Sequence, residues 1–148
     1  GSGAFEIFGR RYDPAGNSLG TEFQVNSYAT GMQSFPAVAA DGSGNFLVVW
    51  NSTEDGSSEG VFGRRFSSSG SAVGSDFQVN SYTTGRQAFP SVAADGSSNF
   101  TVVWRSDLQD GSSWGVFGKR LAVAIFAHGF EAYDACAWSA TVGGGDCP

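Results

Sequence analysis

The hydrophobic positions of this chain form short runs separated by turns rich in glycine, serine and aspartate, and the same runs return along the sequence. The segment FQVNSYATGMQSFPAVAADGSGNFLVVW at residues 23–50 recurs as FQVNSYTTGRQAFPSVAADGSSNFTVVW at residues 77–104. A further run reads IFGRRY at 7–12, VFGRRF at 61–66 and VFGKRL at 116–121. Self-similarity with a period of about 54 residues predicts a repeat architecture.

Each repeat predicts four short strands. EFQVNSY is rich in β-branched and aromatic residues, and PAVAAD opens on a proline, which suits the first position of a strand. An Asp-Gly turn joins PAVAAD to GNFLVVW, and this dipeptide favours a tight hairpin. GVFGRRF is the fourth strand. No segment has a helical hydrophobic period, so we expect an all-β protein.

The run from Phe46 to Trp50 is apolar at every position, whereas a strand with one wet face alternates apolar and polar residues. We therefore expect both faces of this strand to be covered. Its second copy has Thr101 in place of Leu47. Antiparallel four-stranded units covered on both sides are typical of β-propeller blades, with a β-sandwich and a β-solenoid as alternatives.

The repeats divide the chain into four parts: an orphan strand of an incomplete repeat at residues 1–12, repeat 1 at 13–66, repeat 2 at 67–121, and a C-terminal tail or cap at 122–148. A closed propeller takes about 4–8 blades, so two repeats leave blade faces uncovered. A longer chain, a ring of copies or a head-to-tail filament would each cover them.

The orphan strand bears on this choice. We expect Phe5, Ile7, Phe8 and Arg10 to form an assembly strand that completes the sheet of a neighbouring copy. The alternative is that this strand pairs within its own chain and joins the first and last sheets, because most chains bury their own sheet edges.

Composition narrows the partners. The chain has 148 residues with 22 Gly and 13 Phe, and a net charge of -6 without a basic tract, which argues against nucleic acid as a partner. No apolar run approaches the ~20 residues of a membrane helix, so we expect no membrane insertion. Cys136 and Cys147 predict a disulfide and an oxidising compartment. A zinc site that adds His128, Glu131 and Asp134 is the disfavoured alternative.

Several polar positions are candidate sites. The loops with Asp41 and Asn45, and with Asp95 and Asn99, place oxygens at alternating positions as calcium loops do, although a plain hairpin turn explains them better. We expect no other cofactor. The sequons at Asn51 and Asn99 are candidate glycosylation sites.

Aromatic and basic residues give two further candidates. Trp114 replaces Glu59 of the first copy, so the repeat does not demand an aromatic there, and we expect a contact with sugar or with a neighbouring subunit. Six basic residues lie in the repeated VFGRRF strand, where a structural role beside Glu22, Asp76 or aromatic rings is favoured over an anion or glycan contact. These residues are Arg10, Arg11, Arg64, Arg65, Lys119 and Arg120.

The pattern FQVN…VAADG…VVW…DGS…GVFGRR resembles tandem repeats of large secreted bacterial surface proteins, which are read as propeller-like and are mostly uncharacterised. The tail IFAHGFEAYDACAWSATVGGG resembles a C-terminal GFE…W segment of exported bacterial proteins. The resemblance covers nearly the whole chain. It implies an extracellular or bacterial cell-surface location and no particular chemistry.

Taken together, the sequence predicts a non-enzymatic extracellular structural protein. Its expected partner is itself, as the protomer of a head-to-tail homo-assembly or surface filament. A lectin-like carbohydrate-binding module, with glycans as partners, and a fragment of a repeat adhesin are the alternatives.

Overall fold

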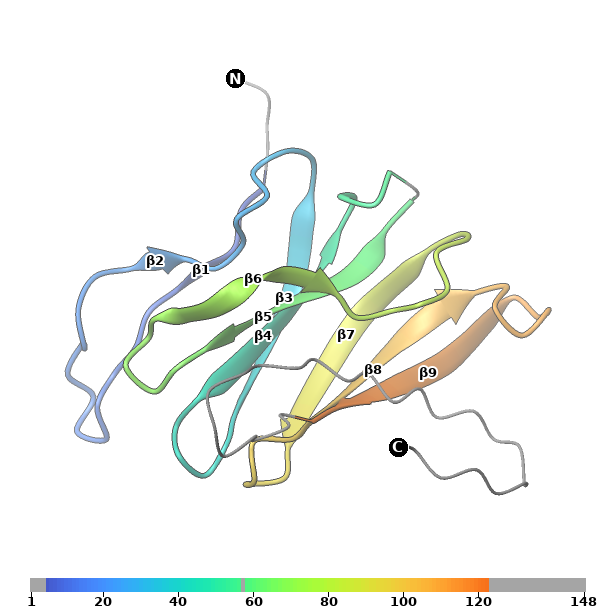
Figure 1. Ribbon diagram of the computed structural model, residues 1–148. Coiled ribbons are helices and arrows are strands. Elements are labelled where there is room, and N and C mark those ends of the chain that lie inside the picture. The colour runs from blue at the N-terminus through green and yellow to red at the C-terminus, as the bar shows by residue number, and fades with distance from the viewer. Residues whose placement is uncertain (1–4, 57, 123–148) are drawn as a thin grey trace.

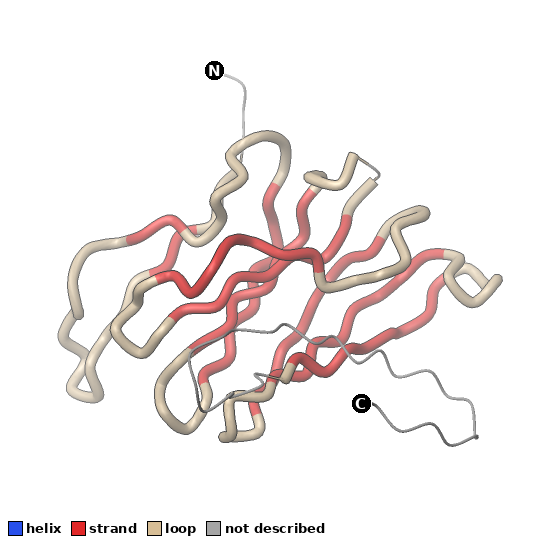
Figure 2. Tube along the Cα trace, viewed as in Figure 1, coloured by secondary structure: helices blue, strands red, loops and turns tan. Residues whose placement is uncertain are grey.

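A computed structural model of the chain describes residues 5–56 and 58–122. These residues form β-strands joined by turns and loops, with no helix among them, as the red and tan tube in Figure 2 shows. The protein is therefore all-β, as predicted. The strands are β1 (Phe8–Gly9), β2 (Phe23–Gln24), β3 (Gln33–Ala40), β4 (Phe46–Ser52), β5 (Gly60–Phe66), β6 (Ala72–Gln78), β7 (Gln87–Ala94), β8 (Phe100–Asp107) and β9 (Trp114–Leu121).

The strands make three antiparallel sheets. The first sheet is the pair β1-β2, the middle sheet has the order β3-β4-β5-β6, and the last sheet has the order β7-β8-β9. Figure 1 shows them following one another across the molecule, from the blue first sheet to the orange last sheet. The middle sheet has the four antiparallel strands of a blade, and within the described residues the sheets do not close into a ring.

The Asp-Gly turns form the hairpins that the sequence predicts. Asp41 joins β3 to β4 and Asp95 joins β7 to β8, and both strand pairs are antiparallel. In each turn the aspartate side chain accepts hydrogen bonds from the backbone two and four residues on. This arrangement closes a tight turn without help from other elements.

The prediction that proline opens a strand is wrong by three residues, because β3 begins at Gln33 and includes Pro36. The ladder between β3 and β4 is irregular between Ser34 and Ala37, and Phe35 has a positive φ of 51°. Such a bulge leaves a residue outside the ladder, and β3 is an edge strand, so Pro36 is tolerated there although it has no N–H.

The middle sheet is covered on both faces. Along β4, residues from Leu47 to Ser52 are all buried, which confirms the expectation drawn from its unbroken apolar run. One face of β4 carries Leu47 and Val49 and packs against the last sheet. The other face carries Val48 and Trp50 and packs against the first sheet. The core of the protein thus consists of two layers, one between each pair of successive sheets.

The sheets are offset from the sequence repeats. The β6 strand opens the second sequence repeat, yet it completes the middle sheet by pairing with β5 of the first. Likewise β2 pairs with β1, the strand before it in the chain. Each Phe-Gln strand therefore closes the sheet of the preceding repeat, and the chain then turns into the first strand of the next sheet.

The N-terminal strand pairs within its own chain. Phe8 lies opposite Gln24 and Gly9 opposite Phe23, and Phe5 forms a bridge with Met32. This pairing is with β2 and not with the last sheet. Whether the strand also serves assembly, as the sequence predicts, is taken up below.

Two further predictions concern membrane insertion and the disulfide. Among the described residues there is no helix with the length and apolarity needed to cross a membrane. Cys136 and Cys147, with His128, Glu131 and Asp134, lie outside the described residues, so the expected disulfide stays a prediction.

Candidate assembly surfaces

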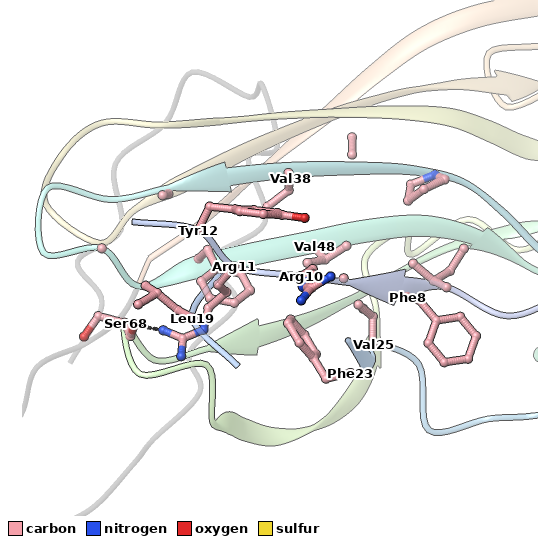
Figure 3. Close-up of a pocket in the computed structure, with 17 residues that line it drawn as sticks. Phe8, Arg10, Arg11, Tyr12, Leu19, Phe23, Val25, Val38, Val48 and Ser68 are labelled. Carbon is pink, nitrogen blue, oxygen red and sulfur yellow. Dashed lines mark hydrogen bonds between the residues drawn. The ribbon is translucent and has the colours of Figure 1, made fainter. Parts of the chain in front are cut away.

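An apolar trough lies beside the middle sheet, where the first sheet covers it only in part. Figure 3 shows the residues that line it, among them Phe8, Tyr12 and Phe23 from the N-terminal segment and Val38 and Val48 from the middle sheet. Its volume is about 490 Å³. Arg11 closes one end, where its Nη1 donates to the carbonyl oxygen of Ser68 at 2.6 Å.

Among the described residues the first sheet has two strands, and these leave the trough open. The side chain of Val38 is 63% exposed, whereas its repeat counterpart Val92 is half-buried against the middle sheet. Pro36 is exposed and its counterpart Pro90 is buried. The same sequence is therefore exposed on β3 and covered on β7. The strand β7 packs against β3 and β4 of the middle sheet, whereas β1 and β2 cover β3 only in part.

The opposite end of the molecule has a second uncovered surface, here named the outer face. It consists of the side chains of β8 and β9 that point away from the middle sheet: Thr101, Val103, Arg105, Trp114, Val116 and Arg120. Val116 is 75% exposed, although its repeat counterpart Val61 is completely buried. The outer edge of β9 also lacks the fourth strand that β6 gives to the middle sheet, as far as the described residues extend.

Between these ends, the interface of the middle and last sheets shows how two such surfaces fit together. Leu47, Val49 and Val61 of the middle sheet pack against Phe100 and Val102. A polar rim accompanies this core. Glu59 pairs with Arg86 at 2.8 Å, and the Asn51 side chain accepts a hydrogen bond from the backbone of Phe89. Successive sheets are thus joined by apolar packing with a polar rim.

The candidate calcium loops already have hydrogen-bond donors on their carboxylates. Asp41 accepts from the Asn45 side chain and, at 2.7 Å, from the hydroxyl of Ser98 in the neighbouring sheet. The Ser98 hydroxyl, with the amide groups of the turn, holds the pKa of Asp41 below its ordinary value. Asp95 accepts from the Asn99 side chain, which lowers the pKa of Asp95.

These contacts assign the two loops to turn formation and, at Asp41, to contact between sheets. A calcium ion would have to displace N–H donors that point at the same oxygens. Among the described residues, no cluster of three or more acidic, histidine or cysteine side chains is placed to hold a metal. Calcium binding stays a prediction.

The two sequon asparagines are both engaged. Asn51 is buried, and its side-chain amide donates to Glu59 at 3.0 Å while its oxygen accepts from Phe89. This leaves no room for a glycan on Asn51 in the folded chain. The amide of Asn99 donates to Asp95 at the surface, so a glycan there would replace a turn contact.

Trp114 lies on the outer face at the first position of β9 and is 38% exposed. The guanidinium of Arg105 covers one side of its ring, with its carbon 4.4 Å from the ring centroid. A sugar that stacked on this side would have to displace Arg105. The exposed remainder of the ring is part of the outer face and is available to a partner.

The repeated basic residues mainly serve the fold. Arg64 pairs with Asp76 at 3.4 Å and donates to the backbone oxygen of Val25 in the first sheet. Several basic side chains also lie over aromatic rings, as Arg10 does over Tyr12. Lys119 repeats the Arg64 contact by donating to the backbone oxygen of Val79. These cations therefore tie one sheet to the next.

The structure also shows a feature that the sequence analysis missed. The asparagine that ends each Phe-Gln-Val-Asn segment is buried and holds the neighbouring strand. The backbone N–H of Val61 donates to Asn80 Oδ1 at 2.7 Å, and Asn80 Nδ2 donates to the carbonyl oxygen of Tyr82. The available signal was a polar residue kept in both copies directly after an apolar strand.

Comparison of the chain with protein-family models, curated proteins and solved structures gives no match. The resemblance to tandem repeats of secreted bacterial proteins therefore stays a prediction, and the argument for function depends on the geometry of the two end surfaces.

Proposed function

We propose that this protein is a non-enzymatic structural protomer that assembles head to tail with copies of itself at the cell surface or outside the cell. One observation carries the proposal. The trough and the outer face, at opposite ends of the molecule, carry the repeat counterparts of the two halves of the interface between the middle and last sheets.

The repeat correspondence makes this explicit. Leu47, Val49 and Val61 form the middle sheet's half of the internal interface, and their counterparts on the outer face are Thr101, Val103 and Val116. Phe100 and Val102 form the other half, and their counterparts Phe46 and Val48 line the trough. The trough of a second copy therefore resembles the surface of the last sheet that packs on the middle sheet. The outer face resembles the surface of the middle sheet that packs on the last sheet.

Such a contact joins two different surfaces, so it is heterologous. Heterologous contacts generate a ring when the rotation between copies closes and an open filament when it does not. The apolar residues left exposed at both ends favour association, because burying them removes apolar area from water. The repeat resemblance and the predicted disulfide support a location outside the cell.

Sedimentation velocity over a concentration series, with electron microscopy of the same samples, tests the proposal. We expect concentration-dependent growth of the wild-type chain into rings or filaments. Val103→Glu puts a charge into the middle of the outer face, and we expect it to raise the concentration needed for assembly by about tenfold or more, because a buried unpaired charge is costly.

Leu108→Glu is the matched control, because Leu108 is an exposed apolar residue in the loop between β8 and β9 and lies outside the outer face. We expect this variant to assemble as the wild type does. A wild-type chain that sediments as a monomer at every concentration up to about 100 µM contradicts the proposed function.

A further inference from the structure

Both copies of the segment Phe-Gln-Val-Asn are bound by the same pattern of two hydrogen bonds, which we call the asparagine clasp. In the first sheet, the N–H of Ile7 donates to Asn26 Oδ1 and the N–H of Val25 donates to the carbonyl oxygen of Ile7, both at 2.8 Å. In the middle sheet, Val61 makes the same two bonds with Asn80 and Val79. The clasp is thus a repeated device by which a strand of the VFGRRF type binds the next Phe-Gln strand.

The β9 strand is the third strand of this type, and its position for the clasp is open among the described residues. Val116 is the counterpart of Ile7 and Val61. Val116 lies opposite Arg105 of β8, and Val61 lies opposite Asn51 of β4 in the same register. The N–H and C=O of Val61 point toward the Phe-Gln strand that follows, so those of Val116 point to the outer edge of β9. An edge with unpaired backbone groups is a template for another strand.

A second pair of positions shows which strand fits this edge. Inside the molecule, the side chain of Glu59 forms a salt bridge with Arg86. The backbone carbonyl oxygen of Glu59 accepts a hydrogen bond from the N–H of Gln87. The counterpart of Arg86 in the first repeat is Met32, and Phe5 bridges it in the same way. The N-terminal segment therefore places an aromatic residue opposite Met32 in the backbone bridge, at the position where the internal interface has an ion pair.

The outer face has the matching change. At the position of Glu59, β9 carries Trp114. The repeat thus departs from its internal ion pair at both ends of the molecule, with a methionine at one end and a tryptophan at the other. A tryptophan in the place of Phe5 would take the same position opposite Met32, and sulfur–aromatic contacts are favourable.

We propose that assembly proceeds by strand exchange: β9 of one copy takes the place of residues 5–12 of the next copy and binds its Phe-Gln-Val-Asn segment at 23–26. The occupant of the β9 edge is thus a second copy of this chain. In the exchanged state Val116 makes the asparagine clasp with Asn26, and Trp114 lies on Met32. The inference rests on the proposed function and names the site through which it operates.

The exchange continues the repeat from one copy into the next. Within the chain, residues 77–80 bind β5 and lead directly into β7, which packs on the middle sheet. In the exchanged state, residues 23–26 bind β9 and lead into β3, whose sheet then packs on the last sheet of the preceding copy. This arrangement covers Val38 in the trough and Val103 on the outer face together. Arg105 replaces Asn51 there, so one internal hydrogen bond has no counterpart.

Residues 5–12 then act as an internal substitute for β9. They hold segment 23–26 through a two-residue ladder until a neighbour displaces them. Ile7 is buried in this contact, while its neighbour Glu6 is exposed and does not line the trough. Weakening the Ile7 contact should therefore promote assembly, whereas a change at Glu6 should not.

The closing experiment measures assembly of the full chain by sedimentation. We expect Trp114→Glu to raise the concentration needed for assembly by about tenfold, because it replaces the ring with a hydrated carboxylate next to the apolar side chain of Met32. Adding Met32→Arg should restore most of the loss, because the two changes together recreate the internal Glu59–Arg86 pair. Rescue by a second substitution on the opposite end of the molecule would not follow from a merely structural role of Trp114.

A second set of variants tests the edge itself. Val116→Pro removes the N–H that the clasp requires, and we expect it to abolish assembly, whereas Val116→Ala keeps the N–H and should assemble at a somewhat higher concentration. Ile7→Ala should lower the concentration needed for assembly several-fold, with Glu6→Ala as the matched control, because Glu6 is exposed and lies outside the trough lining.

The outcomes separate the two proposals. Assembly that persists unchanged in Trp114→Glu and Val116→Pro but is lost in Val103→Glu overturns strand exchange and leaves the proposed function standing. The same result is expected if residues 123–148 of the same chain cover the β9 edge. A wild-type chain that stays monomeric contradicts the proposed function, and strand exchange is then decided by Ile7→Ala: assembly of this variant supports it, and a monomer overturns it.

Discussion

The middle and last sheets have nearly the same sequence but different surroundings. Val61 is completely buried and Val116 is 75% exposed, although both stand at the same position of the same strand type. Along β4 every residue from Leu47 on is buried, whereas β8 alternates between buried and exposed residues. The difference teaches that burial in this protein is set by the number of neighbouring sheets and not by the repeat sequence alone.

The residue at the position of Leu47 differs between the two sheets in the same sense as its burial. Leu47 is completely buried between the middle and last sheets, and its counterpart Thr101 is exposed on the outer face. Val49 and its counterpart Val103 are identical, and Val103 is 40% exposed. The outer face is therefore a less apolar version of a buried interface, as expected of a surface that is exposed before association and covered after it.

The largest effect is expected from exchanging the residues at this position. Leu47→Thr removes apolar contacts and buries a hydroxyl, so we expect a loss of about 2–4 kcal/mol in the free energy of unfolding. Thr101→Leu is the reciprocal change and should alter the stability of the monomer by less than about 0.5 kcal/mol. Urea unfolding below the assembly concentration measures both. Equal losses for the two variants would contradict the role assigned to the neighbouring sheet.

Thr101→Leu sharpens the comparison in a second respect. It makes the outer face more like the internal interface, so the proposed function expects assembly at lower concentration without a change in monomer stability. A variant that assembles no better than the wild type would show that position 101 lies outside the contact between copies.

A smaller effect is expected from the asparagine clasps. Asn80→Ala leaves the buried N–H of Val61 without its acceptor, and we expect a loss of about 1–3 kcal/mol. Asn26→Ala removes the same bond from Ile7, but β1 and β2 form only a two-residue ladder at the end of the molecule. We expect its effect to be confined mainly to faster amide exchange at Ile7, with a smaller change in global unfolding.

Hydrogen exchange followed residue by residue distinguishes these two cases. If Asn26→Ala lowers global stability as much as Asn80→Ala, then the first sheet is as integral to the fold as the middle sheet, and residues 5–12 are not an exchangeable substitute for β9.

Much of the fold could be predicted from the sequence because the decisive signals are local. The unbroken apolar run from Phe46 to Trp50 requires cover on both faces, and the Asp-Gly turns at Asp41 and Asp95 require hairpins. What failed was the assignment of strands to sheets. A repeat has no intrinsic starting point, so the sequence alone does not show that β6 pairs backward with β5 and not forward with its own repeat.

The assembly surfaces were harder to predict for a related reason. Trp114 was selected because it departs from Glu59, and in the structure it is 38% exposed. Its match with Met32 depends on the Glu59–Arg86 bridge, which joins residues of successive sheets and is visible only in three dimensions. Pro36 was misplaced because the bulge at Phe35 has no local sequence signal.

The smallest effect is expected from pH, where the two Asp-Gly turns differ. Both aspartates have a pKa lowered by hydrogen bonds, so each contributes stability that is present above its ordinary pKa and is lost as the pH falls through the folded-state pKa. For Asp41 the main cause is the hydroxyl of Ser98, which belongs to the other sheet. Ser98→Ala should therefore lower the urea midpoint at pH 7, and the difference from wild type should vanish once the pH falls below the lowered folded-state pKa of Asp41.

Ser97→Ala is the matched control for this measurement. Ser97 is exposed, and its backbone N–H, not its side chain, meets Asp95. We expect its urea midpoint to follow the wild type at both pH values. If the Ser98→Ala difference persists at low pH, the contact stabilises the two sheets through packing alone and the charge on Asp41 has no part in it. If it vanishes, the turn of one sheet is an electrostatic contact for the next.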